Sequence, residues 1–139
     1  MAAVLLITSP VYLRHDTGPT HPESPERLTA VLKALDESGL REAVSESSQV
    51  EPVDRDLLEV VHQPEYVEHV ARVARGGGGM LDPDTVVSAA SYEVALAAAG
   101  GVVQAVEGVL GGETRAAFAL VRPPGHHAGK SRIAGFCYL

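Results

Sequence analysis

The sequence is short of cysteine and of positive charge, and each shortage excludes a class of protein. Its single cysteine, Cys137, excludes an internal disulfide and a zinc site built from several cysteines. The 11 Lys and Arg residues are outnumbered by 18 Asp and Glu residues, giving a formal net charge of -7. A nucleic-acid-binding surface needs the opposite balance, so we expect no nucleic-acid partner. Any bound metal would need nitrogen and oxygen ligands.

A recognisable targeting segment is also missing. Residues 1–10 are apolar but lack the basic flank of a signal sequence, and we find no apolar run of the length that crosses a membrane. We therefore predict a cytoplasmic protein without a membrane partner. A length of 139 residues, 45% of them hydrophobic, is typical of one globular domain with its own core.

Strand and helix signals alternate along the chain, which is typical of an α/β domain. The run at 4–7 is continuously apolar, as expected of a strand buried on both faces of a parallel sheet. We predict that this strand lies in the middle, between parallel strands near 50 and 116. The expected strands are 4–7, 50–53 and 116–121, and the expected helices are 25–38, 54–61, 64–74 and 88–110.

Glycines mark two special places in this pattern. Four successive glycines at 76–79 predict a mobile loop. Gly100 and Gly101 interrupt the longest apolar helix, where each costs about 1 kcal/mol relative to alanine. Close packing against another backbone would explain them.

Two adjacent histidines, His126 and His127, follow the last predicted strand. Ligands of open α/β sheets bind at the carboxyl ends of the strands. A neutral imidazole can act as a general base and a protonated one can stabilise an oxyanion, and adjacent rings can divide these roles because their protonations oppose each other. Pro123 and Pro124 stiffen the loop, and Gly125 lets its backbone approach a substrate. The alternative is a surface pair that only satisfies its own hydrogen bonds.

This loop resembles the active-site loop of a known family. Residues 122–128 read Arg-Pro-Pro-Gly-His-His-Ala, and after six residues Gly-Phe-Cys follows at 135–137. The run is similar to that of zinc-dependent histone deacetylases, which include acetylpolyamine amidohydrolases and acetoin-utilisation proteins. Residues 21–28, His-Pro-Glu-Ser-Pro-Glu-Arg-Leu, and an acidic segment with Asp84 resemble two further family motifs. The resemblance implies a three-layer α/β/α fold with a parallel sheet, of the arginase/deacetylase type and incomplete.

The resemblance also implies roles for the residues of the loop and its rim. His127 would be the general base and acid, and His126 its electrostatic neighbour. Phe136 would form one wall of the channel for the acyl-amine stem, and Gly135 would offer its carbonyl beside that channel. Asp84 would hold substrate backbone amides at the rim.

Two residues would lie behind the site. By the resemblance, Arg27 would line an internal pocket, and Cys137 would lie beneath the active centre without acting as a nucleophile. The residues alone leave other readings open. Asp84 can cap a turn, Arg27 can be solvated, and Phe136 can be an ordinary core residue.

The family's metal ligands have no counterpart in the sequence. The resemblance implies zinc held by an Asp-x-His pair and a second aspartate, together with a carbonyl-polarising tyrosine, all after the Gly-Phe-Cys segment. We expect residues 1–139 to be the amino-terminal part of one such domain, ending before these ligands, and to bind no metal tightly. His15, His21, His62 and His69 lack ligand spacing, and we predict His62 and His69 at the surface of short helices.

Two classes of function remain open. The chain is either the amino-terminal segment of a zinc-dependent deacetylase acting on acetylated lysine or an acetylated polyamine, or a catalytically inactive remnant or binding module of that family. A hydrolase with Cys137 as nucleophile and His127 as base is a third alternative, but no orienting Asp or Asn is apparent. The outer edge of the last strand would be left open, which predicts self-association.

Overall fold

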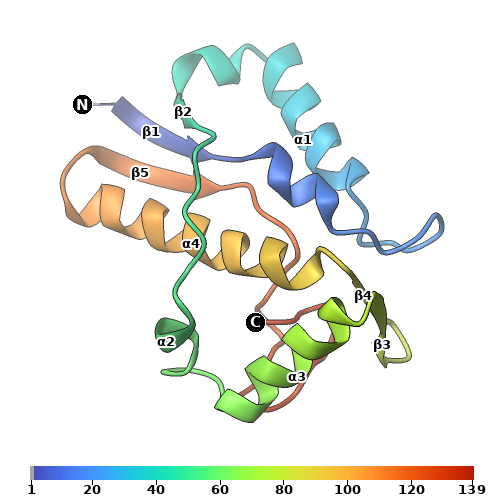
Figure 1. The fold of residues 1–139 in the computed structure, drawn as a ribbon. Coiled ribbons are helices and arrows are strands. Elements are labelled where there is room, and N and C mark those ends of the chain that lie inside the picture. The colour runs from blue at the N-terminus through green and yellow to red at the C-terminus, as the bar shows by residue number, and fades with distance from the viewer. Residues whose placement is uncertain (1) are drawn as a thin grey trace.

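Three parallel strands form the central sheet. In this computed structural model, which describes residues 2–139, the first strand lies in the middle, as predicted (Figure 1). Leu6 is opposite Glu46 on one side and opposite Phe118 on the other. The strands, in sheet order, are β2 (Ser45–Ser47), β1 (Ala2–Ile7) and β5 (Thr114–Ala119).

Helices lie on both sides of this sheet. Leu5 and Ile7 of β1 face Gly108 and Gly101 of α4, whereas Leu6 belongs to a core cluster with Leu28 of α1. Because successive side chains of β1 point to opposite faces of the sheet, β1 contacts one layer of helices on each face. The helices are α1 (Glu26–Glu37), α2 (Arg55–Leu58), α3 (Pro64–Arg75) and α4 (Ser91–Leu110), with short 3-10 helices at Pro10–Arg14 and Leu40–Ala43.

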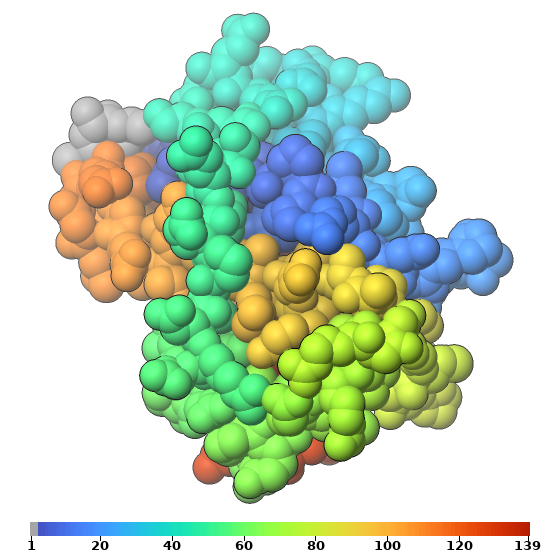
Figure 2. All heavy atoms as spheres, in the orientation of Figure 1, coloured from blue at the N-terminus to red at the C-terminus, as the bar shows by residue number. Residues whose placement is uncertain are grey.

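The second strand is not where the sequence predicts it. β2 ends at Ser47, and residues 49–53 form an extended strap that crosses α4 instead of joining the sheet (Figures 1 and 2). Val50 and Val53 are apolar because they belong to the core clusters that include α4, and the Val53 amide donates to the Leu96 carbonyl at 3.0 Å. A strand and a strap over a helix have the same apolar pattern in sequence.

Close packing explains the two glycines inside α4, against a backbone at Gly100, as predicted, but against side chains at Gly101. A Cβ atom at Gly100 would collide with the Glu51 carbonyl of the strap, and one at Gly101 would lie 2.6 Å from the Tyr12 hydroxyl.

The expectation that no segment is long and apolar enough to cross a membrane is wrong, because α4 meets that test by length and composition. In this fold α4 packs against β1 and β5, so it serves as the core helix of the domain.

The predicted mobile loop at 76–79 is also wrong. Gly76 ends α3, and Gly78 and Gly79 begin β3 (Gly78–Asp82), which pairs antiparallel with β4 (Thr85–Ser88). Gly77 and Gly78 have φ angles of +99° and +105°, and a side chain at Gly78 would collide with the Val87 carbonyl. These glycines permit a tight crossing from helix to hairpin.

Candidate active site

The two adjacent histidines line one side of a groove at the carboxyl end of β5. Their ring centroids are 4.4 Å apart, and both side chains are exposed. The groove has a volume of about 410 Å³ and is also lined by Gly135, Phe136 and Arg27. The groove therefore brings together five of the residues predicted for the site: His126, His127, Gly135, Phe136 and Arg27.

Gly135 and Phe136 form a tight turn against His127. Gly135 has a φ of +56°, and a Cβ atom there would lie 2.7 Å from Cδ2 of the His127 ring, so only glycine allows this approach. Phe136 has a φ of +69°, a left-handed conformation that costs a side-chain-bearing residue about 1–2 kcal/mol. Such strain persists only where surrounding contacts fix the residue, and it concentrates at functional sites.

Cys137 lies directly behind this turn and is fully buried. Its amide donates to the Ala134 carbonyl at 3.0 Å, and its thiol donates to the Gly135 carbonyl at 3.4 Å. Burial raises the pKa of the thiol, which disfavours the thiolate that a nucleophile requires. The structure thus gives no support to a hydrolase that attacks through Cys137.

Asp84 is not among the residues that line the groove. It is exposed in the turn between β3 and β4, where its amide donates to Asp82 Oδ1 at 3.0 Å and its own carboxylate accepts from Thr85. Its backbone carbonyl nevertheless accepts a 2.8 Å hydrogen bond from His21 Nε2. The ring of His21 packs edge-on against Phe136, with centroids 4.7 Å apart. Asp84 is therefore connected to the groove through His21.

A buried ion pair beneath the groove escaped the sequence analysis. The side chains of Arg122 and Glu23 are only 1% and 2% exposed, and Arg122 Nε lies 3.0 and 3.1 Å from the two carboxylate oxygens. Arg122 Nη1 also donates to the carbonyls of Tyr12 and His15, at 2.8 and 2.5 Å. Arg122 immediately precedes the Pro-Pro-Gly-His-His run, so these bonds fix the start of the histidine loop.

Glu23 connects this buried pair to the groove. Its carboxylate lies 3.9 Å from Arg27, whose side chain is mostly exposed, and Glu23 itself lines the groove. Arg27 is thus neither fully solvated nor enclosed in an internal pocket within the described residues. The Thr17 hydroxyl donates to the Glu23 carbonyl at 2.6 Å and holds the same segment from its other side.

His15 is a buried, neutral histidine next to Arg122. Its Nδ1 is 2.7 Å from the Ser91 hydroxyl, and its ring lies edge-on to Tyr138. Burial, followed by the positive charge of Arg122, lowers its pKa from 6.5 to about 3. Among residues 2–139, His15 Nε2 and Arg122 Nη2 are the buried side-chain nitrogens without a hydrogen-bond partner.

The pKa of His15 predicts loss of stability in acid. Below pH 6.5 the unfolded chain protonates His15 and the folded chain does not until about pH 3, so this residue lowers the free energy of unfolding by about 1.4 kcal/mol per pH unit in that window. We expect His15→Asn, which can still bond Ser91, to show a shallower decline. Urea unfolding of both proteins from pH 7 to pH 4 measures the difference, and parallel curves would contradict the assignment.

The remaining histidines divide between core and surface. His62, predicted at the surface, is buried, and its Nδ1 lies 2.8 Å from the Gly129 carbonyl. The neighbouring Gln63 amide donates to the Lys130 carbonyl, so the start of α3 anchors the segment after the histidine loop. His69 is exposed on α3, as predicted. The exposure of His62 depends on this distant segment, which no local pattern reveals.

The described residues do not fit a zinc ion. Within residues 2–139, no three His, Cys, Asp or Glu side chains come close enough together to hold a metal. A zinc site needs three or four protein ligands, and His126 and His127 have no third partner of this kind. This part of the chain supplies the groove and its histidines but no metal-binding group.

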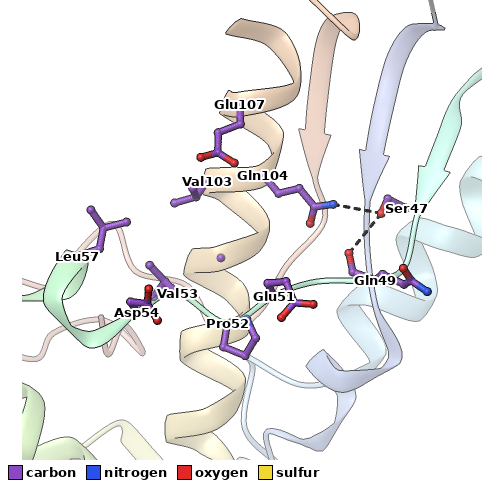
Figure 3. Close-up of a pocket in the computed structure, with 11 residues that line it drawn as sticks. Ser47, Gln49, Glu51, Pro52, Val53, Asp54, Leu57, Val103, Gln104 and Glu107 are labelled. Carbon is purple, nitrogen blue, oxygen red and sulfur yellow. Dashed lines mark hydrogen bonds between the residues drawn. The ribbon is translucent and has the colours of Figure 1, made fainter. Parts of the chain in front are cut away.

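A larger groove lies between the strap and α4, and it shares no lining residue with the histidine groove. Its volume is about 520 Å³ (Figure 3). Gln104 of α4 donates to the Ser47 hydroxyl, which in turn donates to the Gln49 carbonyl, so these polar groups bind one another. No histidine or cysteine lines it, and its carboxylates are not grouped with other metal-binding side chains in the described part of the chain. The histidine groove is therefore the candidate site.

Comparison with known proteins shows the family of the chain. The histone deacetylase domain model matches residues 21–139. The chain is 42% identical over 130 residues to a probable deacetylase of Archaeoglobus fulgidus and 39% identical over 119 residues to a histone deacetylase-like amidohydrolase of Pseudomonas aeruginosa. These alignments cover 92% and 86% of this chain but only 36% and 31% of the relatives.

The fold has a close counterpart among solved structures. The crystal structure of the HDA15 HD domain superimposes with a TM-score of 0.91 at 28% identity, covering 99% of this chain and 40% of that one. The chain thus spans less than half the length of the proteins that it matches. Its parallel sheet, its histidine groove and the match over residues 21–139 show that the chain belongs to the histone deacetylase family.

Proposed function

We propose that this chain is the amino-terminal part of an amidohydrolase that removes acetyl groups from acetylated lysine or from an acetylated amine of the polyamine type. The observation that carries the proposal is the pair of imidazoles facing a groove with Phe136 and Gly135. The relatives support the reaction class, since they include the Pseudomonas amidohydrolase and a mouse polyamine deacetylase, HDAC10, 35% identical over 127 residues.

In the proposed reaction, His127 takes a proton from the attacking water and returns it to the leaving amine. The water oxygen bonds to the acetyl carbon, the carbon–nitrogen bond breaks, and the products are acetate and a free amine. His126 is the electrostatic neighbour of His127 in this proposal, with the two ring centroids 4.4 Å apart. Phe136 supplies an apolar wall for the methylene stem of the substrate.

Arg27 and Asp84 have supporting roles in this proposal. Arg27 lines the groove with its guanidinium largely free of the nearby Glu23, so it can attract the acetate product. Asp84, exposed in the hairpin turn, is available to bind backbone amides of an acetylated peptide. Gly135 lies against the ring of His127, and Cys137 supports the turn from below by donating its thiol hydrogen to the Gly135 carbonyl.

Zinc belongs to this proposal only through the rest of a complete domain. The family is generally zinc-dependent, whereas no group in residues 2–139 can hold the ion. Because the matched relatives are more than twice as long as this chain, we place the metal ligands in sequence equivalent to their remainder. The second candidate is an inactive remnant or binding module of the family, which would need no metal-binding group.

The outer edge of β5 is the surface that we propose for self-association. β5 is an edge strand of the three-stranded sheet, and Phe118 on it is 47% exposed. An unpaired strand edge is a template for another strand. The proposed partner is therefore a second copy when this chain is alone.

A chimera tests the catalytic proposal. Residues 1–139 replace the matching segment of the Pseudomonas amidohydrolase, and hydrolysis of an acetyl-lysine peptide and of an acetylated polyamine is measured. We expect His127→Gln to lower kcat by about 10²–10⁴-fold, the usual contribution of a general base. His69→Gln, the same change at an exposed position on α3, is the matched control and should leave the rate unchanged.

Two results would contradict the proposal. A folded His127→Gln chimera with the parent rate would show that this imidazole is not the base. A folded chimera without turnover on either substrate, measured beside an active Pseudomonas parent, would favour the inactive remnant.

A further inference from the structure

His21 contacts three segments that surround the histidine groove, although the proposed reaction does not use it. Its Nδ1 accepts a 3.0 Å hydrogen bond from the Glu23 amide, and its Nε2 lies 2.8 Å from the Asp84 carbonyl. The edge of its ring packs against Phe136. One side chain thus joins the segment after the first loop, the hairpin turn and the wall of the groove.

The main-chain atoms around this ring fix its orientation. Nε2 donates a hydrogen bond to the Asp84 carbonyl, and Nδ1 lies 3.0 Å from the Glu23 amide and 3.2 Å from the Glu23 carbonyl. An imidazole with both nitrogens bound cannot rotate without losing a bond. The face that it presents to Phe136 is therefore constant.

The backbone conformation of Phe136 has to be held in place by contacts such as the one with His21. It adopts a left-handed backbone conformation directly after Gly135, which does the same, so the backbone alone does not favour this turn. Cys137 anchors the turn from below through its amide, and the ring of Phe136 extends away from that anchor to line the groove. The ring contact with His21 is the aromatic contact that the described residues provide for it.

We propose that His21 is a positioning residue that fixes the Phe136 wall of the histidine groove, and with it the width of the groove, and so determines which amine stems fit there. The inference rests on the proposed amidohydrolase function for its substrates. His21 belongs to neither core cluster and is only partly buried, so its removal leaves the packing of the domain intact. Its effect is on the width of the groove.

Substrate selectivity in the chimera is the first test. Two matched peptides are compared, one with acetyl-lysine and one with N-acetyl-4-aminomethylphenylalanine, whose stem is a benzyl group. We expect His21→Ala to raise KM for acetyl-lysine about tenfold, as loss of one aromatic contact allows, with kcat within about twofold. The ratio of kcat/KM values should shift toward the benzyl stem.

His21→Phe separates the ring contact from the hydrogen bonds. It keeps an aromatic ring beside Phe136 but loses both main-chain partners, so we expect a selectivity between those of the parent and His21→Ala. His69→Ala, on the exposed face of α3, is the control. An unchanged selectivity ratio in His21→Ala would overturn the proposal.

Thiol labelling of the 139-residue chain is a second test that needs no activity. Cys137 is the single cysteine, is fully buried, and is adjacent to Phe136, so its reaction with a thiol reagent reports opening of this turn. We expect His21→Ala to speed labelling about tenfold while the urea midpoint stays close to the parent, and His69→Ala to do neither. Unchanged labelling would overturn the positioning role.

The two tests distinguish failure of the proposed role of His21 from failure of the proposed amidohydrolase function. If the parent chimera is inactive, the amidohydrolase proposal fails, and labelling alone still decides whether His21 holds the turn. If labelling accelerates while an active chimera keeps its selectivity, the turn is held by His21 but the claim that it sets the groove width is overturned.

Discussion

Replacing Arg122 with methionine is expected to destabilise the protein by about 3–5 kcal/mol, a large part of the stability of a domain of this size. The reason is the buried position of the pair, since Arg122 is 1% and Glu23 2% exposed. Without the guanidinium, the Glu23 carboxylate stays in the interior, and the cation that remains beside it is the mostly exposed Arg27, 3.9 Å away. Urea unfolding followed by circular dichroism measures the change.

A double variant separates charge from packing. Glu23→Leu with Arg122→Met removes both charges, so we expect it to regain about half of the loss or more, because apolar replacement of a buried pair is often neutral. Recovery is incomplete because the carbonyls of Tyr12 and His15 still lose their donor. Arg41→Met, which breaks an exposed ion-pair cluster, should shift the midpoint little. An Arg122→Met protein as stable as the parent would contradict this account.

Residues 1–139 alone are expected to bind zinc weakly, without fixed stoichiometry, and to show no hydrolysis of acetyl-lysine. A catalytic zinc site requires three protein ligands and an open position, and no such group of side chains forms within residues 2–139. His127 without a metal neither polarises the carbonyl nor acidifies the water. Metal analysis of the dialysed protein beside a deacetylase assay measures both properties.

The same preparation is expected to self-associate through β5. Sedimentation velocity should show concentration-dependent species larger than a monomer, and Phe118→Lys, which places a charge on the edge strand, should reduce them. About one tightly held zinc per chain together with chelator-sensitive turnover would show that the site is more complete than we propose. A monomer at all concentrations would exclude the edge as a contact surface.

Local patterns predicted the elements whose environment is set by their own residues. The continuous apolar run at 4–7 gave the middle strand β1, and the apolar segment before Gly111 gave α4 with its two closely packed glycines. The histidine loop was predicted from its place after a strand and from a specific run of residues. These features need little knowledge of distant neighbours.

Features that depend on distant neighbours could not be predicted. Arg122 and Glu23 are 99 residues apart, and nothing local to either shows that they pair. Val50 and Val53 face a helix rather than a sheet, yet both environments select the same apolar side chains. His62 is buried only because a later segment covers it. In each case the sequence near the residue does not show which distant segment the residue contacts.

The position of β1 in the sheet has a consequence for how the chain is made. Val4 pairs with Ala116, so β1 cannot complete its ladder until the chain has left the ribosome beyond residue 116. Long-range parallel pairing of this kind folds slowly, and until it forms an apolar strand remains available to other chains. During synthesis β1 is therefore a segment that a chaperone can protect, although in the finished fold it becomes the middle strand of the sheet.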